Sequence, residues 1–209
     1  MGDQRRVICT LGVGPHTELL DIVRPSLERY AVRHGYDLVT RTDVDGIGTR
    51  PPAWGKVALV RGLLERYDVV VWIDVDAVIV DPTDDIAAVR WPRPIHLVHH
   101  VIDGVVIPNA GVFVMRRCRS SLRLLERIWH DERWIDHRWW ENAALIAAVG
   151  GDGDVGLTTR RSRLRARGVF GELDHRWNSI PPCPAPQPAI VHLAGVSHSE
   201  RVAQLRALV

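Results

Sequence analysis

Two aspartates, Asp74 and Asp76, directly follow a strongly apolar stretch, VVVWI at residues 69–73. Side chains two residues apart on an extended chain point to the same side. Two carboxylates on one side, next to a buried strand, repel each other and lose hydration, so a positive group is expected between them. Hard divalent cations bind carboxylate oxygens and often bridge to substrate phosphates. The pair therefore predicts a cation site that holds a diphosphate.

A turn after a strand is the simpler explanation for acidic residues here. It suits Asp81, Asp84 and Asp85, which lie in the polar segment after residue 80 and which we assign to turn and helix-start positions. Asp74 and Asp76 lie between two apolar stretches, VVVWI and AVIV, and that setting favours the cation.

Residues 70–78 also fit the pattern of the haloacid-dehalogenase-like phosphatases, in which an apolar strand ends in a nucleophilic Asp and an acid/base Asp two residues later. GGDGD at residues 150–154 resembles the later acidic motif of that family. The family needs a lysine between the two motifs, but Lys56 is the only lysine of this chain. Its nucleophile strand also usually opens the domain, whereas two strands are expected earlier here. A phosphohydrolase that uses Asp74 and Asp76 is the alternative hypothesis.

The elements that must position these aspartates alternate between strand and helix, which predicts a doubly wound α/β fold. Ligands of such sheets bind at the carboxyl ends of the strands, where the two aspartates lie. Strands are expected at residues 5–10, 36–42, 69–73, 96–100, 112–115 and 189–195. Helices are expected from Pro25 to Gly35, over 54–67, near 84–89, over 120–129 with serine caps, over 141–149 and at the C-terminus. The segment after residue 151 is rich in Gly, Arg and Pro and predicts loops.

Length and composition indicate an ordinary soluble globular protein. A chain of 209 residues with a charged fraction of 25% suits one domain, residues 1–209, with a sizeable core. The start of the chain lacks a signal-peptide pattern, and no apolar run is long enough for a membrane span. The three scattered cysteines suit packing in a reducing compartment, so we expect a cytoplasmic protein. A net charge of +2 gives no support for nucleic-acid binding.

Six segments in one order resemble a family of glycosyltransferases. They are YAVRHGYDLV, WGKVALVRGLLERYDVVVWIDVDAVI, NAGVFVMR, WWENAAL, RWNSIP and VHLAG. The order is similar to that of the fungal α-galactosyl- and α-mannosyltransferases and the plant xyloglucan xylosyltransferases. The resemblance implies an α/β GT-A-type Rossmann-like fold, with a mostly parallel central sheet and helices on both faces.

The resemblance also implies the ligands of the metal. Asp74 and Asp76 would hold a divalent cation, Mn²⁺ or alternatively Mg²⁺, and His192 in VHLAG would complete the site. A lone histidine after an apolar strand is otherwise most often a core residue. Related enzymes have a basic residue shortly afterwards, where this chain offers His198 and Arg201.

Residues around the nucleotide sugar follow from the same resemblance. Lys56 matches a lysine that contacts phosphate, although a solvated helix residue is the plain alternative. Thr10 lies where such enzymes seat the nucleoside, and Gly195 would let the backbone approach a phosphate. Asn109 and Gly111 would border the donor sugar, the amide bonding a hydroxyl and the glycine leaving room for the ring.

The start of the helix at 141–149 matches a place where the family usually has an acidic residue followed by glutamine, close to the anomeric carbon and the acceptor hydroxyl. Glu141 would orient or deprotonate the acceptor, and Asn142 replaces a longer glutamine. Complementing the helix dipole is the alternative role for Glu141. Trp139 and Trp140 would form an apolar floor for a sugar or pack in the core, and we leave both open. In the family, the asparagine of HRWN, here residues 175–178, lies near the site.

The implied reaction is retaining transfer of a hexose or pentose from a UDP- or GDP-sugar to a hydroxyl of a small molecule or glycan. A non-catalytic scaffold subunit with the same fold is the second alternative. TTRRSRLRARG, residues 158–168, places four arginines at alternate positions, and a solvated loop is the expected structure. Binding of an acidic acceptor, or closure over the donor phosphates, is the alternative role of this stretch.

Overall fold

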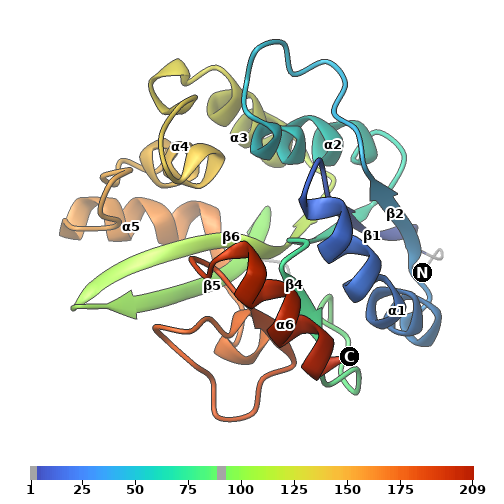
Figure 1. The fold of residues 1–209 in the computed structure, drawn as a ribbon. Coiled ribbons are helices and arrows are strands. Elements are labelled where there is room, and N and C mark those ends of the chain that lie inside the picture. Colours follow the sequence, from blue (N-terminus) through green and yellow to red (C-terminus); the bar gives the residue numbers. More distant parts are fainter. Residues whose placement is uncertain (1–3, 89–92) are drawn as a thin grey trace.

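The structure is a computed structural model that describes residues 4–88 and 93–209. Its centre is a six-stranded sheet in the order β2-β1-β3-β6-β5-β7 (Figure 1). The strands are β1 (Arg6–Leu11), β2 (Asp37–Arg41), β3 (Val69–Ile73), β5 (Ile95–Ile102), β6 (Val105–Arg116) and β7 (Phe170–Glu172). Only β6 runs against the others, because β1 is parallel to β2 and β3, and β5 is antiparallel to β6 but parallel to β7. The mostly parallel sheet predicted from the sequence is confirmed.

Helices cover both faces of this sheet, as predicted (Figure 1). One apolar core joins Val70 and Trp72 of β3 to α2 (Gly55–Leu63), α3 (Arg119–Trp129) and α4 (Trp140–Ala148). The other joins Val69 and Val71 of the same strand to α1 (His16–His34) and α6 (His198–Leu208). Alternate residues of β3 thus point into different cores, which explains why VVVWI is apolar throughout.

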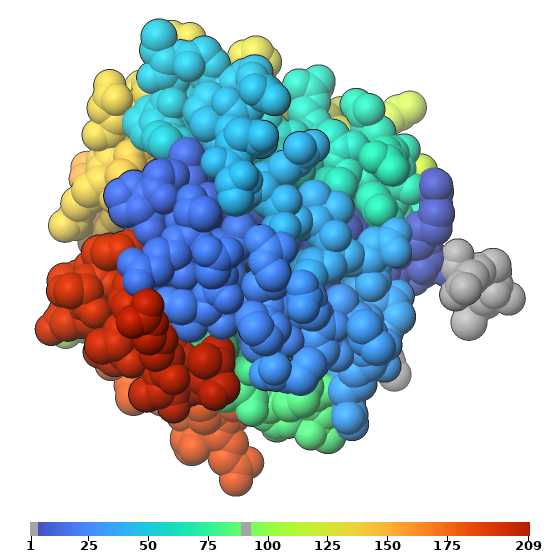
Figure 2. Space-filling view, turned by 45° about the vertical axis from the view of Figure 1, so that its right-hand side comes forward, coloured from blue at the N-terminus to red at the C-terminus, as the bar shows by residue number. Residues whose placement is uncertain are grey.

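A second, two-stranded sheet pairs β4 (Ala77–Ile79) with β8 (Ile190–His192) in antiparallel register. β4 begins four positions after the end of the predicted strand at 69–73, within the apolar stretch AVIV, for which no strand was predicted. Through this pairing, the chain returns near its C-terminal end to the carboxyl end of β3. Figure 2 shows the C-terminal part of the chain packed against the N-terminal part, in agreement with the Arg206–Glu18 ion pair between α6 and α1.

Most predicted elements are present, with corrected boundaries. The first helix does not begin at Pro25 but at His16, because Leu19, Leu20 and Val23 extend its buried face over the preceding turns. It ends as predicted at Gly35, whose φ of 69° suits glycine. The predicted helix at 54–67 is divided into η1 (Pro52–Trp54) and the shorter α2.

Three local predictions were wrong. Residues 84–88 form bends and turns rather than a helix, and Val89 lies outside the described residues. α3 has no serine cap, since its N-cap is Cys118 and Ser121 instead donates a hydrogen bond to the Arg116 carbonyl. The region after 151, predicted as loops, contains α5 (Arg160–Val169), β7 and η3 (His175–Asn178). A further short helix, η2 (Glu132–Trp134), lies between α3 and α4.

Candidate metal centre

The carboxyl end of β3 is fixed by backbone hydrogen bonds on both sides. The Asp74 N–H donates to the Gly111 carbonyl of β6 over 2.7 Å, and the Ala77 N–H donates to the Asp74 carbonyl over 3.0 Å. The chain therefore turns between the two aspartates and continues as β4. Since Ala77 is paired with His192 in the β4–β8 register, this turn brings the histidine beside the aspartates.

Asp74, Asp76 and His192 converge as predicted. The His192 Nε2 atom lies 3.3 Å from Asp76 Oδ1 and 3.8 Å from Asp74 Oδ2. One ligand atom from each residue lies within 4.8 Å of the others. Two carboxylates and an imidazole nitrogen are a suitable donor set for a divalent cation. The three residues fit the ion that the sequence resemblance implies.

The electrostatics of the cluster also fit a cation. Burial favours neutral His192, but the carboxylate of Asp76 outweighs it and raises the histidine pKa. Burial likewise opposes the charge of Asp76, yet His192 and Arg201 hold the pKa of this carboxyl far below its usual range. Arg201 Nε lies 3.3 Å from Asp76 Oδ2. The cluster thus stabilises positive charge between its carboxylates, the charge that a bound ion would supply.

Lys56 lies behind Asp74 in a buried position. Its Nζ atom is 2.9 Å from Asp74 Oδ1 and 2.6 Å from Glu141 Oε1, and it donates to the Ala110 carbonyl over 3.1 Å. An ammonium group has three hydrogens, so these partners use all of them. Burial lowers the pKa of Lys56, but the two carboxylates more than reverse this effect and raise it. A direct phosphate contact would therefore have to replace one of the three partners.

The N-terminus of α4 brings Glu141 and Asn142 to the same region. Glu141 is buried; burial raises its pKa and the nearby Lys56 opposes that rise. Its Oε1 atom binds Lys56, whereas Oε2 has no hydrogen-bond partner among the described residues. Asn142 accepts a hydrogen bond from the Ala110 N–H over 2.8 Å. Both residues therefore support β6 and Lys56 directly behind Asp74.

Asn109 and Gly111 lie on β6 next to the cluster. A Cβ atom added to Gly111 would lie 2.1 Å from His192 Cε1, so the glycine makes room for the imidazole. Asn109 Oδ1 accepts hydrogen bonds from the Gly111 N–H and from Asn178 Nδ2. Asn178, from HRWN, also contacts His192 Nδ1 over 2.8 Å. Sequence reasoning placed this asparagine near the site but did not identify its contact with the histidine.

Other predicted site residues lie apart from these contacts. Thr10 is fully buried, and its hydroxyl has no hydrogen-bond partner among the described residues. Gly195 has a φ of 76° and open space at its Cβ position. Of the two basic candidates, Arg201 reaches Asp76, whereas His198 Nε2 lies 3.6 Å from Glu18.

The two tryptophans before Glu141 differ in their surroundings. Trp139 packs against the core that contains α4, and its ring lies near His137. Trp140 is 41% exposed and has a φ of 41°, a backbone conformation that is uncommon for a bulky side chain.

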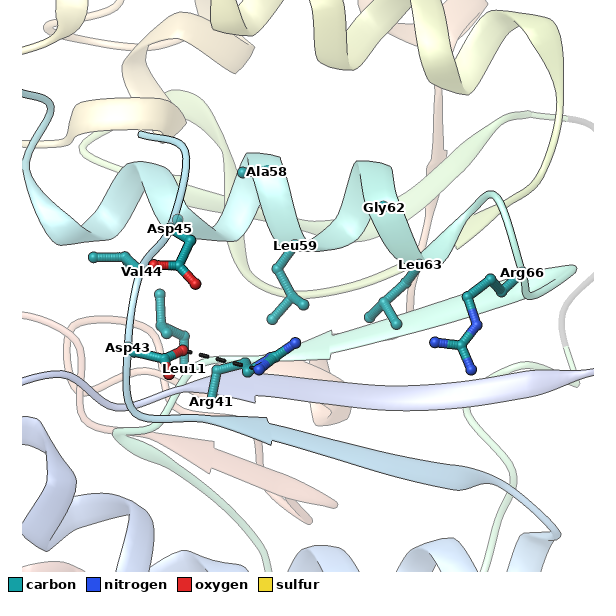
Figure 3. Close-up of a pocket in the computed structure, with 11 residues that line it drawn as sticks. Leu11, Arg41, Asp43, Val44, Asp45, Ala58, Leu59, Gly62, Leu63 and Arg66 are labelled. Atoms are coloured by element: carbon teal, nitrogen blue, oxygen red, sulfur yellow. Dashed lines mark ion pairs between the residues drawn. The ribbon is translucent and has the colours of Figure 1, made fainter. Parts of the chain in front are cut away.

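A hollow of about 280 Å³ lies between α2 and the carboxyl ends of β1 and β2 (Figure 3). Leu59 and Leu63 point into it from α2, and Arg41 and Arg66 lie at its rim. Its wall includes Gly55, the neighbour of Lys56 in the sequence. No sequence motif marks this pocket, because its wall combines a helix with the irregular segment at 43–45.

The acidic motif expected for a phosphohydrolase does not join the aspartates. Asp154 instead pairs with His137 over 2.6 Å, and Asp152 accepts a hydrogen bond from the Asp154 backbone N–H. Among the described residues, the one group of at least three potential metal ligands is Asp74, Asp76 and His192. The second acidic motif thus has a local structural role.

Comparisons with known proteins found similar structures but no similar sequence. No family model matches the chain, and no curated protein matches it either. A glycosyltransferase involved in the glycosylation of the major capsid of PBCV-1 has a similar structure, with a TM-score of 0.73 and 17% identity. The match covers 97% of this chain and 99% of that one.

Two further glycosyltransferase structures are similar over most of their length. The galactosyltransferase LgtC, in complex with donor and acceptor sugar analogues, has a TM-score of 0.55 and 12% identity over 96% of this chain and 95% of its own. A mutant of the Drosophila β-1,4-galactosyltransferase 7, with manganese, UDP-Gal and xylobiose, has a TM-score of 0.53 and 11% identity over 94% and 73%. At these identities the likeness establishes the fold, which is the predicted GT-A type.

Proposed function

We propose that this protein is a metal-dependent glycosyltransferase that moves a hexose or pentose from a UDP- or GDP-sugar to an acceptor hydroxyl. The observation that carries the proposal is the convergence of Asp74, Asp76 and His192 at the carboxyl end of β3. That place is where open α/β sheets bind their ligands. The similar folds of several glycosyltransferases support the same conclusion.

In this proposal Asp74, Asp76 and His192 hold the cation, with Mn²⁺ preferred over Mg²⁺ because one ligand is an imidazole. When bound, the ion would neutralise the charge that develops on the departing diphosphate. Asn109 and Gly111 border the donor sugar, and Thr10 and Gly195 lie toward the nucleotide. Lys56 holds Asp74 in place, and it contacts phosphate only if it exchanges one of its three present partners.

Glu141 and Asn142 are the proposed catalytic pair. The carboxylate of Glu141 has one oxygen committed to Lys56 and one without a hydrogen-bond partner among the described residues, and the second oxygen is the one we assign to the acceptor hydroxyl. We propose retention of configuration on the resemblance of the sequence to retaining enzymes, and we assign no protein nucleophile. An NMR assay of the anomeric product tests the retention directly.

We further propose that residues 1–209 act as a single domain on a small-molecule or glycan acceptor. No helix in the described part of the chain is long and apolar enough to cross a membrane. The three cysteines are free, which suits the reducing cytoplasm as the site of action.

The test is a screen of UDP- and GDP-sugars for hydrolysis and transfer with Mn²⁺, Mg²⁺ or a chelator. We expect turnover of at least one donor that requires the metal, and Asp76→Asn should abolish it. Asp84→Asn is the matched control, since Asp84 is an exposed aspartate that pairs with Arg176 away from the cluster. Metal-dependent turnover that survives in Asp76→Asn would refute the assigned site.

The two alternatives predict different results in the same screen. A scaffold subunit would turn over no donor and would bind nucleotides without regard to metal. A phosphohydrolase would cleave phosphomonoesters through a phosphoaspartate on Asp74, which mass spectrometry would detect. Its expected second motif pairs with His137 instead of Asp74, and this contact disfavours that alternative.

A further inference from the structure

A chain of three hydrogen bonds connects the backbone of β6 to the inner nitrogen of His192. The Gly111 N–H donates to Asn109 Oδ1 over 2.8 Å, Asn178 Nδ2 donates to the same oxygen over 3.0 Å, and Asn178 Oδ1 lies 2.8 Å from His192 Nδ1. Asn178 has no exposed surface, and His192 is 4% exposed. Water cannot readily replace these bonds.

The direction of every bond in this chain follows from its first member. A backbone N–H can only donate, so the Asn109 atom that faces Gly111 must be the amide oxygen. The Asn178 atom that faces this oxygen must in turn be the amide nitrogen. The other end of the Asn178 side chain is therefore the oxygen, which can only accept. His192 Nδ1 must then carry a hydrogen.

The outer nitrogen of the ring is left for a ligand. A neutral imidazole has one hydrogen, and with that hydrogen on Nδ1 the lone pair lies on Nε2. Nε2 is the atom directed toward Asp76 Oδ1 and Asp74 Oδ2. We propose that Asn178 and Asn109 form a relay that fixes the tautomer and orientation of His192, so that Nε2 is ready to bind the cation. This inference rests on the proposed metal-dependent function.

The relay is held in place by further buried contacts. His100 on β5, which is 1% exposed, bonds through Nε2 to the Asn178 carbonyl over 2.7 Å. The His192 N–H donates to the Ser179 carbonyl over 2.8 Å, which fixes β8 next to the residue after Asn178. β6 packs so closely against His192 and Asn109 at Gly111 that a side chain at this position would collide with them. Asn178 is therefore a positioning residue, with no proposed contact to substrate.

The first experiment measures binding of Mn²⁺ alone to the full chain by calorimetry. Loss of a partner that orients a metal-bound histidine typically weakens metal affinity by about 10- to 100-fold. We expect that loss for Asn178→Ala. Ser121→Ala is the matched control, because it removes another fully buried hydrogen-bonding side chain, which donates to the Arg116 carbonyl at the far end of β6 and has no contact with His192. It should leave the Mn²⁺ affinity nearly unchanged.

The second experiment observes the tautomer itself. In ¹⁵N-histidine NMR of the Zn²⁺-loaded wild-type protein, with His192 assigned by its loss in His192→Gln, we expect the hydrogen on Nδ1. A hydrogen on Nε2 would overturn the relay even if Asn178→Ala failed to fold. Unchanged Mn²⁺ affinity in a folded Asn178→Ala protein would overturn it too. If the wild type bound neither ion but showed Nδ1–H without metal at high pH, the proposed function would fail and the relay would stand.

Discussion

At the scale of single residues, three basic side chains offset the repulsion between the two neighbouring carboxylates of the cluster. Asp74 contacts Lys56, Asp76 contacts Arg201, and His192 lies between the two carboxylates. Breaking a buried ion pair leaves an uncompensated charge, so these contacts are interdependent. A divalent ion bound to His192 Nε2 would take the place of a proton on that nitrogen as the source of positive charge between the carboxylates.

Gly111 offers the sharpest single-residue prediction. A methyl group at this position would lie 2.1 Å from His192 Cε1, so Gly111→Ala must displace the imidazole or β6. We expect a loss of Mn²⁺ affinity in calorimetry and a free energy of unfolding lower by about 1–3 kcal/mol, the usual cost of overpacking.

Gly62→Ala is its control. Gly62 lies in α2 with open space at its Cβ position, so the added methyl should be tolerated or slightly stabilising. Wild-type Mn²⁺ affinity in Gly111→Ala would show that the imidazole does not need this space.

His100 gives the stability of the protein a dependence on pH. Burial lowers its pKa to about 4 from an ordinary value of 6.5, although its bond to the Asn178 carbonyl opposes the shift. Below pH 6.5, His100 becomes protonated in the unfolded chain but stays neutral in the native state. The free energy of unfolding therefore falls as the pH decreases toward 4. Between pH 6.5 and 5 this residue should cost up to about 2 kcal/mol.

The measurement is chemical denaturation of wild type and His100→Gln at pH 7, 6 and 5. Glutamine keeps a donor for the Asn178 carbonyl but does not titrate. The wild type should therefore lose more stability than the variant over this range. Parallel losses in the two proteins would show that His100 titrates normally.

At the scale of elements, strand patterns were readable because burial on both faces leaves an apolar run, as in β3. Helix ends were harder. α1 continues through Pro25, since the buried stripe from Leu19 to Leu27 outweighs the hydrogen bond that proline cannot make. α5 was missed because its face toward the core contains small residues, Ser162 and Ala166, which give no apolar periodicity.

The capping box of α5 tests why this helix forms. The Thr159 hydroxyl accepts a hydrogen bond from the Ser162 N–H over 3.0 Å, and the Ser162 hydroxyl accepts one from the Thr159 N–H over 3.2 Å. Five exposed arginines and no acid make the helix otherwise self-repelling. Thr159→Ala should lower the free energy of unfolding by about 1 kcal/mol.

Thr158→Ala, at the exposed neighbouring position, should change the stability little. The free energies of unfolding of both variants should be measured by denaturant titration at low salt, where repulsion between the arginines is strongest. Equal effects of the two substitutions would mean that the cap does not stabilise α5.

At the scale of the whole molecule, the sequence predicted which side chains meet in the candidate site but not the packing contacts that hold them there. The convergence of Asp74, Asp76 and His192 was predictable because carboxylates and imidazoles are among the few side chains that can hold a metal, and because the motifs that contain them stand in a recognisable order. The roles of Asn178 and Gly111 were not, because they depend on how η3 and β8 pack against β6. Such contacts between distant segments follow from the complete fold and leave no local pattern.

The same connections predict how the molecule unfolds. The site takes Lys56 from α2, Asp74 from the end of β3, Glu141 from α4 and His192 from β8. Because β3 contributes to both apolar cores, neither core can lose its packing without exposing the other. We therefore expect one cooperative transition, seen together in far-UV circular dichroism and tryptophan fluorescence, and shifted as a whole by Mn²⁺ with UDP or GDP. Two separate transitions, with only one of them shifted by the ligand, would mean that the site belongs to a smaller folding unit than residues 1–209.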